Sequence, residues 1–287
     1  MTARTLSRVI DALPSSDGAG VRIKRSLGQS QFARMDPFLM LDEFRSDDAA
    51  DYIGGFPSHP HRGFETVTYM LAGAMLHKDS LGNEGHLKAG DVQWMTAARG
   101  IVHSEMPQQE EGLMHGFQLW INLPAKEKMK TPRYQDIPSE RITEVSEPGL
   151  ALRVIAGTIE RGGKRHEGPV SGITTEPTYL DVTLEANTPF IQSTPREHSG
   201  VIYVFAGEIT VVGKTVKNGQ AALLSEGDEV GVTAGAAGAR FLMLTAKPIN
   251  EPVVQHGPFV MNTREEIEQA VRDFQNGRFV SEAPVIS

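Results

Sequence analysis

The sequence contains no cysteine among its 287 residues. Disulfide bonds, thiolate metal ligands and cysteine nucleophiles are therefore excluded, and any metal ion must be held by histidine, carboxylate or water. Basic residues are also fewer than acidic ones: 28 lysine and arginine residues and 36 aspartate and glutamate residues give a formal net charge of −8. A chain of this charge is not expected to bind nucleic acid directly as its main function, although a local basic patch remains compatible with it.

Long apolar runs are absent as well. No stretch approaches the roughly 18 apolar residues of a membrane helix, and the first residues, Met1–Leu6, lack the apolar core of a secretory signal. We therefore expect no membrane association and a cytoplasmic protein. The motifs of a nucleophile elbow, a P-loop and a dinucleotide-binding turn are also missing, which argues against several common classes of enzyme.

Glycine and proline are abundant, with 29 and 17 copies, and indicate many turns between short strands. Alternating or continuous apolar runs without strong helices between them predict an all-β sandwich or barrel fold. The clearest predicted strands lie at residues 20–24, 66–71, 117–122, 151–155, 180–184, 200–205 and 240–244. The length of the chain suits two domains.

A weak internal repeat supports two copies of one β unit. Residues 65–73 and 200–207 each form an alternating strand that ends in Ala-Gly, and a Gly-Asp pair follows each of them, at Gly90 and Gly227. A polar segment broken by proline lies between Pro124 and Leu150. We therefore predict an N-terminal domain at 1–135 and a C-terminal domain at 136–287.

One helix is predicted near the C-terminus. Thr263 and Glu266 form a capping box at its start, and Gly277 ends it. Ile267, Ala270, Val271 and Phe274 give an apolar stripe at helical spacing. The helix is expected to pack against a barrel.

Histidine carries the most specific signal. Two histidines lie two positions apart, at His59 and His61, and the pair His103 and Glu105 repeats this spacing some 40 residues later. Side chains two apart in a strand point to the same side. If the two segments are neighbouring strands, three imidazole nitrogens and one carboxylate converge, and this donor set suits Fe, Mn, Ni, Cu or Zn better than Mg or Ca.

The roles of two further residues near this set, Glu65 and His115, stay open. Glu65 follows His61 by four residues and has the parity to face the same way, unless Arg62 and Gly63 break the strand. It could replace Glu105 as a ligand, or it could orient an imidazole N–H. His115 begins an alternating strand and points either into the core or towards the site.

The motifs around these residues resemble those of the pirin family, which belongs to the cupin superfamily. The pattern His-x-His-x-x-x-Glu at 59–65 looks like the first cupin motif, and residues 90–103 look loosely like the second, without its usual Pro and Gly. Those departures are similar to the ones that pirins show. The similar stretches are Asp36–Phe44, Gly55–Thr66, Gly90–Pro107, His115–Asn122 and Glu251–Thr263.

This resemblance implies a bicupin of two stacked jelly-roll β-barrels with one metal ion in the N-terminal barrel. The implied ligands are His59, His61, His103 and Glu105, with Glu65 outside the coordination sphere. Fe(II) is the metal that pirins suggest, and Mn, Ni, Co, Cu and Zn remain alternatives. Several pirins are similar to quercetin 2,3-dioxygenases, whereas eukaryotic members are nuclear regulators with protein partners.

The second half of the sequence supports a single site independently. Aligning the two Ala-Gly turns and the two Gly-Asp pairs brings four residues to the positions of the proposed ligands. These are Ser193, Pro195, Arg240 and Leu242. They cannot form the same metal site, so the C-terminal barrel is expected to carry none.

Two functions from different classes follow. The first is a dioxygenase that binds a flavonol-like aromatic substrate and dioxygen, with Glu105, or alternatively Glu65, accepting the substrate's hydroxyl proton. The second is a non-enzymatic, iron-dependent regulator in which a redox change at the metal alters loops that contact a protein partner. An open coordination position with room for an aromatic molecule would favour the enzyme.

Overall fold

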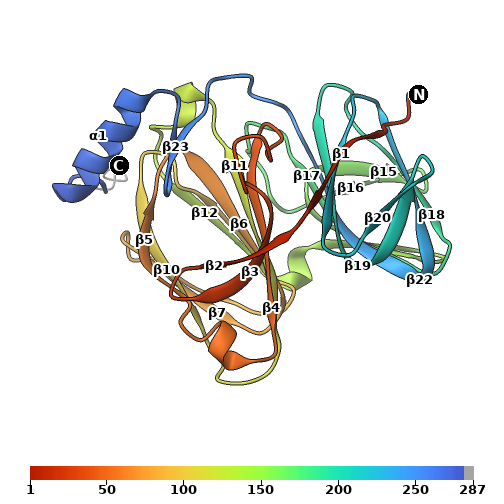
Figure 1. Ribbon diagram of the computed structural model, residues 1–287, viewed down its shortest axis with the longest axis horizontal. Helices are drawn as coiled ribbons and strands as arrows, with labels where there is room; N and C mark the ends of the chain where they lie inside the picture. The colour runs from red at the N-terminus through yellow and green to blue at the C-terminus, as the bar shows by residue number, and fades with distance from the viewer. Residues whose placement is uncertain (281–287) are drawn as a thin grey trace. The chain divides into compact units, whose positions relative to one another are not determined.

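The computed structural model describes residues 1–280, and these residues are built mainly of β-strands, as the sequence predicted (Figure 1). All seven strands expected from the sequence are present. The chain forms two compact units, one made of residues 1–13, 24–40 and 139–248, and the other of residues 14–23, 41–138 and 249 onwards. We refer to these as unit 1 and unit 2.

The two units differ from the contiguous segments 1–135 and 136–287 expected from the sequence. Strand β1 (Leu6–Asp11) pairs with β21 (Gln220–Leu224), which assigns the start of the chain to unit 1. The chain leaves unit 1 after Pro248, and the C-terminal segment belongs to unit 2. Backbone pairing between distant parts of the sequence, rather than composition, therefore decides the membership of both ends.

Unit 1 contains a nine-stranded antiparallel sheet around an apolar core. Seven strands follow the order β1-β21-β19-β22-β17-β14-β13, with β18 and β20 paired to β22 and β19. Besides β1 and β21, the strands are β13 (Thr143–Glu147), β14 (Leu150–Ala156), β17 (Thr178–Leu184), β18 (Pro189–Ser193), β19 (Ser199–Val211), β20 (Lys214–Lys217) and β22 (Glu229–Ala246). A hairpin of β15 (Thr158–Arg161) and β16 (Lys164–Glu167), and a 3-10 turn at Ser139–Arg141, also belong to the unit.

The interior of unit 1 is filled with side chains such as Phe190, Val204 and Phe241, all of them buried. Arg240, at one of the positions aligned with a proposed ligand, instead pairs with Asp181 at 2.6 Å. Within residues 1–280, the one group of three or more residues that could hold a metal ion lies in unit 2.

Unit 2 holds a four-stranded sheet and most of a seven-stranded sheet. The first has the order β5-β10-β7-β8 and the second the order β12-β9-β6-β11-β4-β3-β2. The four strands are β5 (Phe56–His61), β7 (Met75–Asp79), β8 (Glu84–Leu87) and β10 (Ile101–Pro107). The seven are β2 (Leu13–Asp17), β3 (Val21–Leu27), β4 (Phe38–Ser46), β6 (Phe64–Ala72), β9 (Val92–Thr96), β11 (Met114–Asn122) and β12 (Arg133–Ile137). Two 3-10 turns lie at Ala49–Asp51 and Ala125–Glu127.

The expected C-terminal helix is confirmed. Helix α1 (Arg264–Gln275) begins with the full capping box of Thr263 and Glu266, and Gly277 follows its end with a φ of 67°. The hairpin of β23 (Val254–His256) and β24 (Phe259–Met261) precedes it, and α1 lies beside β23 (Figure 1). No helix within residues 1–280 is long and apolar enough to cross a membrane.

Candidate metal centre

The two histidine-bearing segments are adjacent strands of the four-stranded sheet, as the sequence argument required. Strands β5 and β10 pair antiparallel, with His103 directly opposite His59 and Ile101 opposite His61. Residues opposite each other in an antiparallel pair point to the same face. All three histidines therefore project from one face of the sheet.

The imidazole nitrogens of the three histidines converge. One ring nitrogen from each of His59, His61 and His103 lies within 4.8 Å of the other two. The Nε2 atoms of His59 and His61 are 2.9 Å apart. Two nitrogens bound at right angles to one ion, at about 2.1 Å each, would be separated by about 3.0 Å, so the pair already has the spacing of neighbouring metal ligands.

The surroundings favour the neutral, metal-binding form of the rings. Burial, reinforced by the neighbouring histidines, lowers the pKa of His61 and of His103 well below the usual value. His59 Nδ1 lies 2.8 Å from the Pro57 carbonyl oxygen. Because that oxygen only accepts, Nδ1 carries the proton and Nε2 offers its lone pair. His103 Nε2 is buried and has no hydrogen-bond partner among the described residues, which a metal ion would satisfy.

Glu105 is buried on the same strand, but its carboxylate is not part of the three-histidine group. The register of β5 and β10 shifts between His103 and Glu105, so that Glu105 lies opposite Phe56 and β5 carries one extra residue. Glu105 Oε1 lies 2.8 Å from the hydroxyl of Thr68, which is also 2.7 Å from Gln118 Oε1. A hydroxyl has one proton and donates to one of these acceptors at a time.

Glu65 occupies the opposite face of its strand. Its carboxylate accepts hydrogen bonds from Thr96 Oγ1 at 2.6 Å and Trp94 Nε1 at 3.2 Å, and burial raises its pKa. Along β6, Thr68 points towards Glu105 and has the opposite parity to Glu65. Glu65 therefore points away from the side of β6 that carries the contacts to the site.

The structure adds His77, whose role the sequence did not indicate. His77 lies opposite Glu105 in the register of β7 and β10, and its Nδ1 is 3.3 Å from His103 Nδ1. Its Nε2 is 3.2 Å from the hydroxyl of Tyr134. This chain of contacts holds the His103 ring from the side opposite to its free nitrogen. The alternation of β7 was the available signal, because His77 and Asp79 have the spacing of two seen in the ligand pairs.

His115 belongs to a different environment. Its Nε2 lies 3.0 Å from Glu43 Oε1, and both side chains are buried. Its ring also lies 5.6 Å from the ring of Phe117. Phe117 is on the fully buried face of β11, so His115 pairs with a carboxylate in the core and does not line the histidine group.

Two aromatic rings border the histidines on the other side. The rings of Phe64 and Trp120 are 4.3 Å apart, and each is within about 5 Å of the His61 ring, with centroid distances of 5.1 and 5.2 Å. Along β11, Gln118 and Trp120 are partly exposed whereas Leu119 and Ile121 are buried. The half-exposed His59 and this face of β11 leave the site accessible to solvent.

Comparison with known proteins places these features in a family. The model of the family described as Pirin matches residues 20–121, and that of the Pirin C-terminal cupin domain matches residues 179–280. A pirin-like protein of Caulobacter vibrioides is 48% identical over 97% of this chain and 100% of its own length. Human pirin is 43% identical over 92% of this chain and 89% of its own length.

A solved structure agrees in fold and sequence. The crystal structure of a quercetin 2,3-dioxygenase from Acinetobacter baumannii superposes with a TM-score of 0.88 at 34% identity, over 96% of this chain and 98% of that one. Both cupin domains expected from the sequence are therefore confirmed, and the donor set of the first is suited to a transition metal ion. On the family models, on identities above 40% across nearly the whole chain, and on the two cupin units, this chain belongs to the pirin family.

Proposed function

We propose that this protein is a metal-dependent dioxygenase of the pirin type that cleaves the ring of a flavonol-like aromatic substrate. The observation that carries the proposal is the convergence of three imidazoles beside the rings of Phe64 and Trp120, of which Trp120 is partly exposed. The name of the Acinetobacter baumannii relative, quercetin 2,3-dioxygenase, supports the same class of reaction. We take Fe(II) as the expected metal, with Mn, Ni, Co, Cu and Zn as alternatives to be tested.

His59, His61 and His103 would hold the ion, with Glu105 as the fourth ligand. Glu105 would approach the ion from the same strand as His103, while its Oε1 stays against the Thr68 hydroxyl. The bound ion would supply Lewis-acid chemistry, polarising the hydroxyl and carbonyl oxygens of the substrate. Four ligands from the chain would leave open positions on an octahedral ion.

The remaining steps rest on the chain's own residues. Glu105 is proposed to accept the proton of the substrate's hydroxyl group, because it is buried two residues after His103 on the same strand. The Thr68 hydroxyl would hold the carboxylate while it does so. Phe64 and Trp120 would exclude water from one side of the ring and offer an apolar surface to an aromatic substrate.

Oxygen consumption tests the proposal directly. Metal-free protein is loaded without oxygen with each metal in turn, and dioxygen uptake is recorded after quercetin is added. We expect uptake above that of the same metal in buffer, and loss of uptake with a chelator or in His103→Ala. If no metal gives uptake above the buffer control, the dioxygenase hypothesis fails. The regulator hypothesis, tested by whether iron oxidation changes binding of a protein partner, would then lead.

A further inference from the structure

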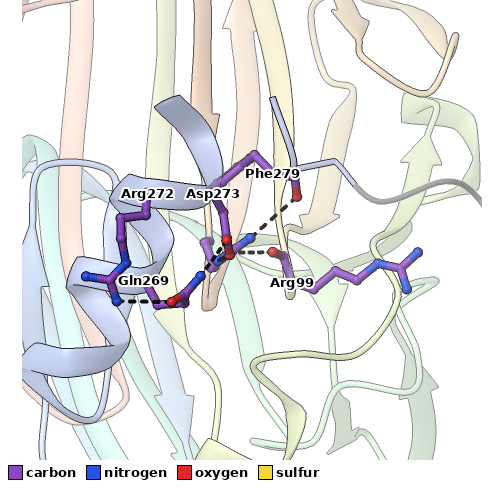
Figure 2. Close-up of polar contacts among 6 residues, drawn as sticks. Arg99, Gln269, Arg272, Asp273 and Phe279 are labelled. Carbon is purple, nitrogen blue, oxygen red and sulfur yellow. Dashed lines mark hydrogen bonds and ion pairs between the residues drawn. The ribbon is translucent and has the colours of Figure 1, made fainter. Parts of the chain in front are cut away.

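Arg62, the residue directly after His61, connects the site to the C-terminal helix. It is buried, and its guanidinium donates to Asp273 of α1 at 2.7 Å, to the Arg99 carbonyl oxygen at 2.5 Å and to the Phe279 carbonyl oxygen at 3.4 Å. The guanidinium carbon also lies 4.4 Å from the centre of the Phe279 ring. Figure 2 shows that the polar contacts of Asp273, Arg99 and Phe279 converge on one point beside α1.

The backbone around Arg62 is held by the same C-terminal segment, residues 249–280. Arg62 N–H donates to the Pro258 carbonyl at 3.2 Å, and Val260 N–H donates to the Arg62 carbonyl at 3.0 Å. A side-chain carbon at Gly63 would collide with the Val260 carbonyl oxygen, so only glycine permits this close approach.

The second ligand strand is covered by the C-terminal segment too. Val102, next to His103, packs against an apolar cluster formed by Phe259, Met261, Ile267, Ala270 and Phe279. A side-chain carbon at Gly100 would lie 2.9 Å from the Phe279 carbonyl oxygen. Residues adjacent to two of the three histidines therefore rest on the same segment.

The buried side chain of Lys128 links the turn after His61 to the C-terminal segment. Its ammonium donates to the carbonyl oxygens of Gly63 at 2.6 Å and Val260 at 3.0 Å, and to Asn122 Oδ1 at 2.6 Å. All three of its protons are used by acceptors in the turn after His61, in β24 and in β11. The turn after His61 and the C-terminal segment are thus joined through the buried Lys128 side chain as well as directly.

We propose that α1 is a clamp for the metal ligands and that Arg62 is the positioning residue through which it acts, so that metal binding and docking of α1 stabilise each other. The inference rests on the proposed metal centre. The ion pair of Arg62 and Asp273 is largely buried, with side-chain exposures of 4% and 22%. Removing the carboxylate leaves an uncompensated positive charge beside a site for a cation, and it releases the helix from the segment after His61.

Asp273→Asn tests the clamp, with Glu268→Gln as the matched control. Both substitutions remove one negative charge from α1, but Glu268 is exposed and pairs only loosely with Arg272, at 3.8 Å. We expect Asp273→Asn to weaken Co(II) binding, measured by chelator competition, by about 10–100-fold, as changes beside metal ligands typically do. Glu268→Gln should change it by about twofold at most, the usual range for a surface substitution. Asp273→Glu should restore binding, because it returns the carboxylate.

Amide hydrogen exchange in α1 distinguishes coupling to the metal from a role of Asp273 in stability alone. By linkage, a ligand that binds more tightly when α1 is docked must itself favour docking. Co(II) should therefore slow amide exchange in α1 of the unaltered protein, and this protection should be lost in Asp273→Asn but kept in Glu268→Gln. The visible spectrum of bound Co(II) should change in Asp273→Asn as the ligand geometry relaxes.

The outcomes separate the two proposals. If the unaltered protein binds Co(II) but Asp273→Asn binds it as tightly as Glu268→Gln does, or if α1 exchange is unaffected by the metal, the clamp is refuted and the metal centre stands. If the unaltered protein binds no metal, the metal centre itself is refuted. Should Asp273→Asn fold poorly by circular dichroism, Arg62→Lys, which keeps the charge but loses the forked contacts, provides the same comparison.

Discussion

Thr68 Oγ1 lies 2.8 Å from Glu105 Oε1, across the boundary between the two sheets of unit 2. Thr68 comes from β6 of the seven-stranded sheet and Glu105 from β10 of the four-stranded sheet. The hydroxyl is positioned to hold the carboxylate of the proposed fourth ligand. The sheet that carries no histidine of the group thus contributes to the orientation of the site.

Replacing Thr68 with valine should weaken metal binding. The substitution keeps the shape of the side chain but removes the hydrogen bond that orients Glu105, and such outer contacts are typically worth about 10–100-fold in affinity. Titration with Ni(II) and a competing chelator measures the change. Thr66→Val, on the same face of the same strand, is the control, and an equal loss in both variants would contradict a specific role for Thr68.

Substitutions of Glu105 and Glu65 should differ clearly in their effect on metal affinity. Glu105→Gln is expected to lower metal affinity far more than Glu65→Gln, because Glu65 is turned towards Thr96 and Trp94. Metal content after dialysis against a weak chelator measures the difference. The reverse order would mean that Glu65 is the carboxylate ligand and that the strand must rearrange around the ion.

Metal stoichiometry should be about one ion per chain. The three histidines form the one group of this kind within residues 1–280, and His59→Ala or His103→Ala should remove most of the bound metal while the β-sheet spectrum in circular dichroism is retained. His86→Ala is a suitable control, because that side chain is 60% exposed. Two tightly bound ions per chain, measured by elemental analysis, would refute the assignment.

The metal-free protein should lose stability as the pH falls below about 6.5, the value of an unperturbed histidine. Burial lowers the pKa of His61 and His103 in the folded state, so below pH 6.5 the unfolded chain binds protons that the folded chain does not. Each histidine then lowers the free energy of unfolding by about 1.4 kcal/mol per pH unit, until the pH reaches its folded-state pKa.

Urea unfolding of the metal-free protein between pH 7.5 and 5 measures this slope. His103→Gln should make the slope shallower, since one of the histidines with a lowered pKa is removed while a buried side chain of similar size remains. A variant with the same slope as the unaltered protein would show that His103 takes up its proton equally in both states.

The sequence alone determined the β-rich fold, the C-terminal helix, the family and the three histidines. The reason is physical: strand alternation, a capping box and ligand pairs at a spacing of two are local patterns, and His103 need only lie on a strand next to His59 for the rings to converge. The repeat and the cysteine-free composition carried no information about distant pairing, such as that of β1 with β21, so the sequence offered only a division into contiguous segments.

Only the tertiary structure decided which way Glu65 points and which residues support the ligands. The spacing of four residues between His61 and Glu65 does not place both side chains on the same face. The reason is that β5 ends at His61, Gly63 adopts a φ of 91° and β6 begins at Phe64. A new strand starts a new alternation. His77 and Asp273 reach the ligand segments from elements far along the chain, and contacts of that kind are fixed by packing and strand register, which no local pattern contains.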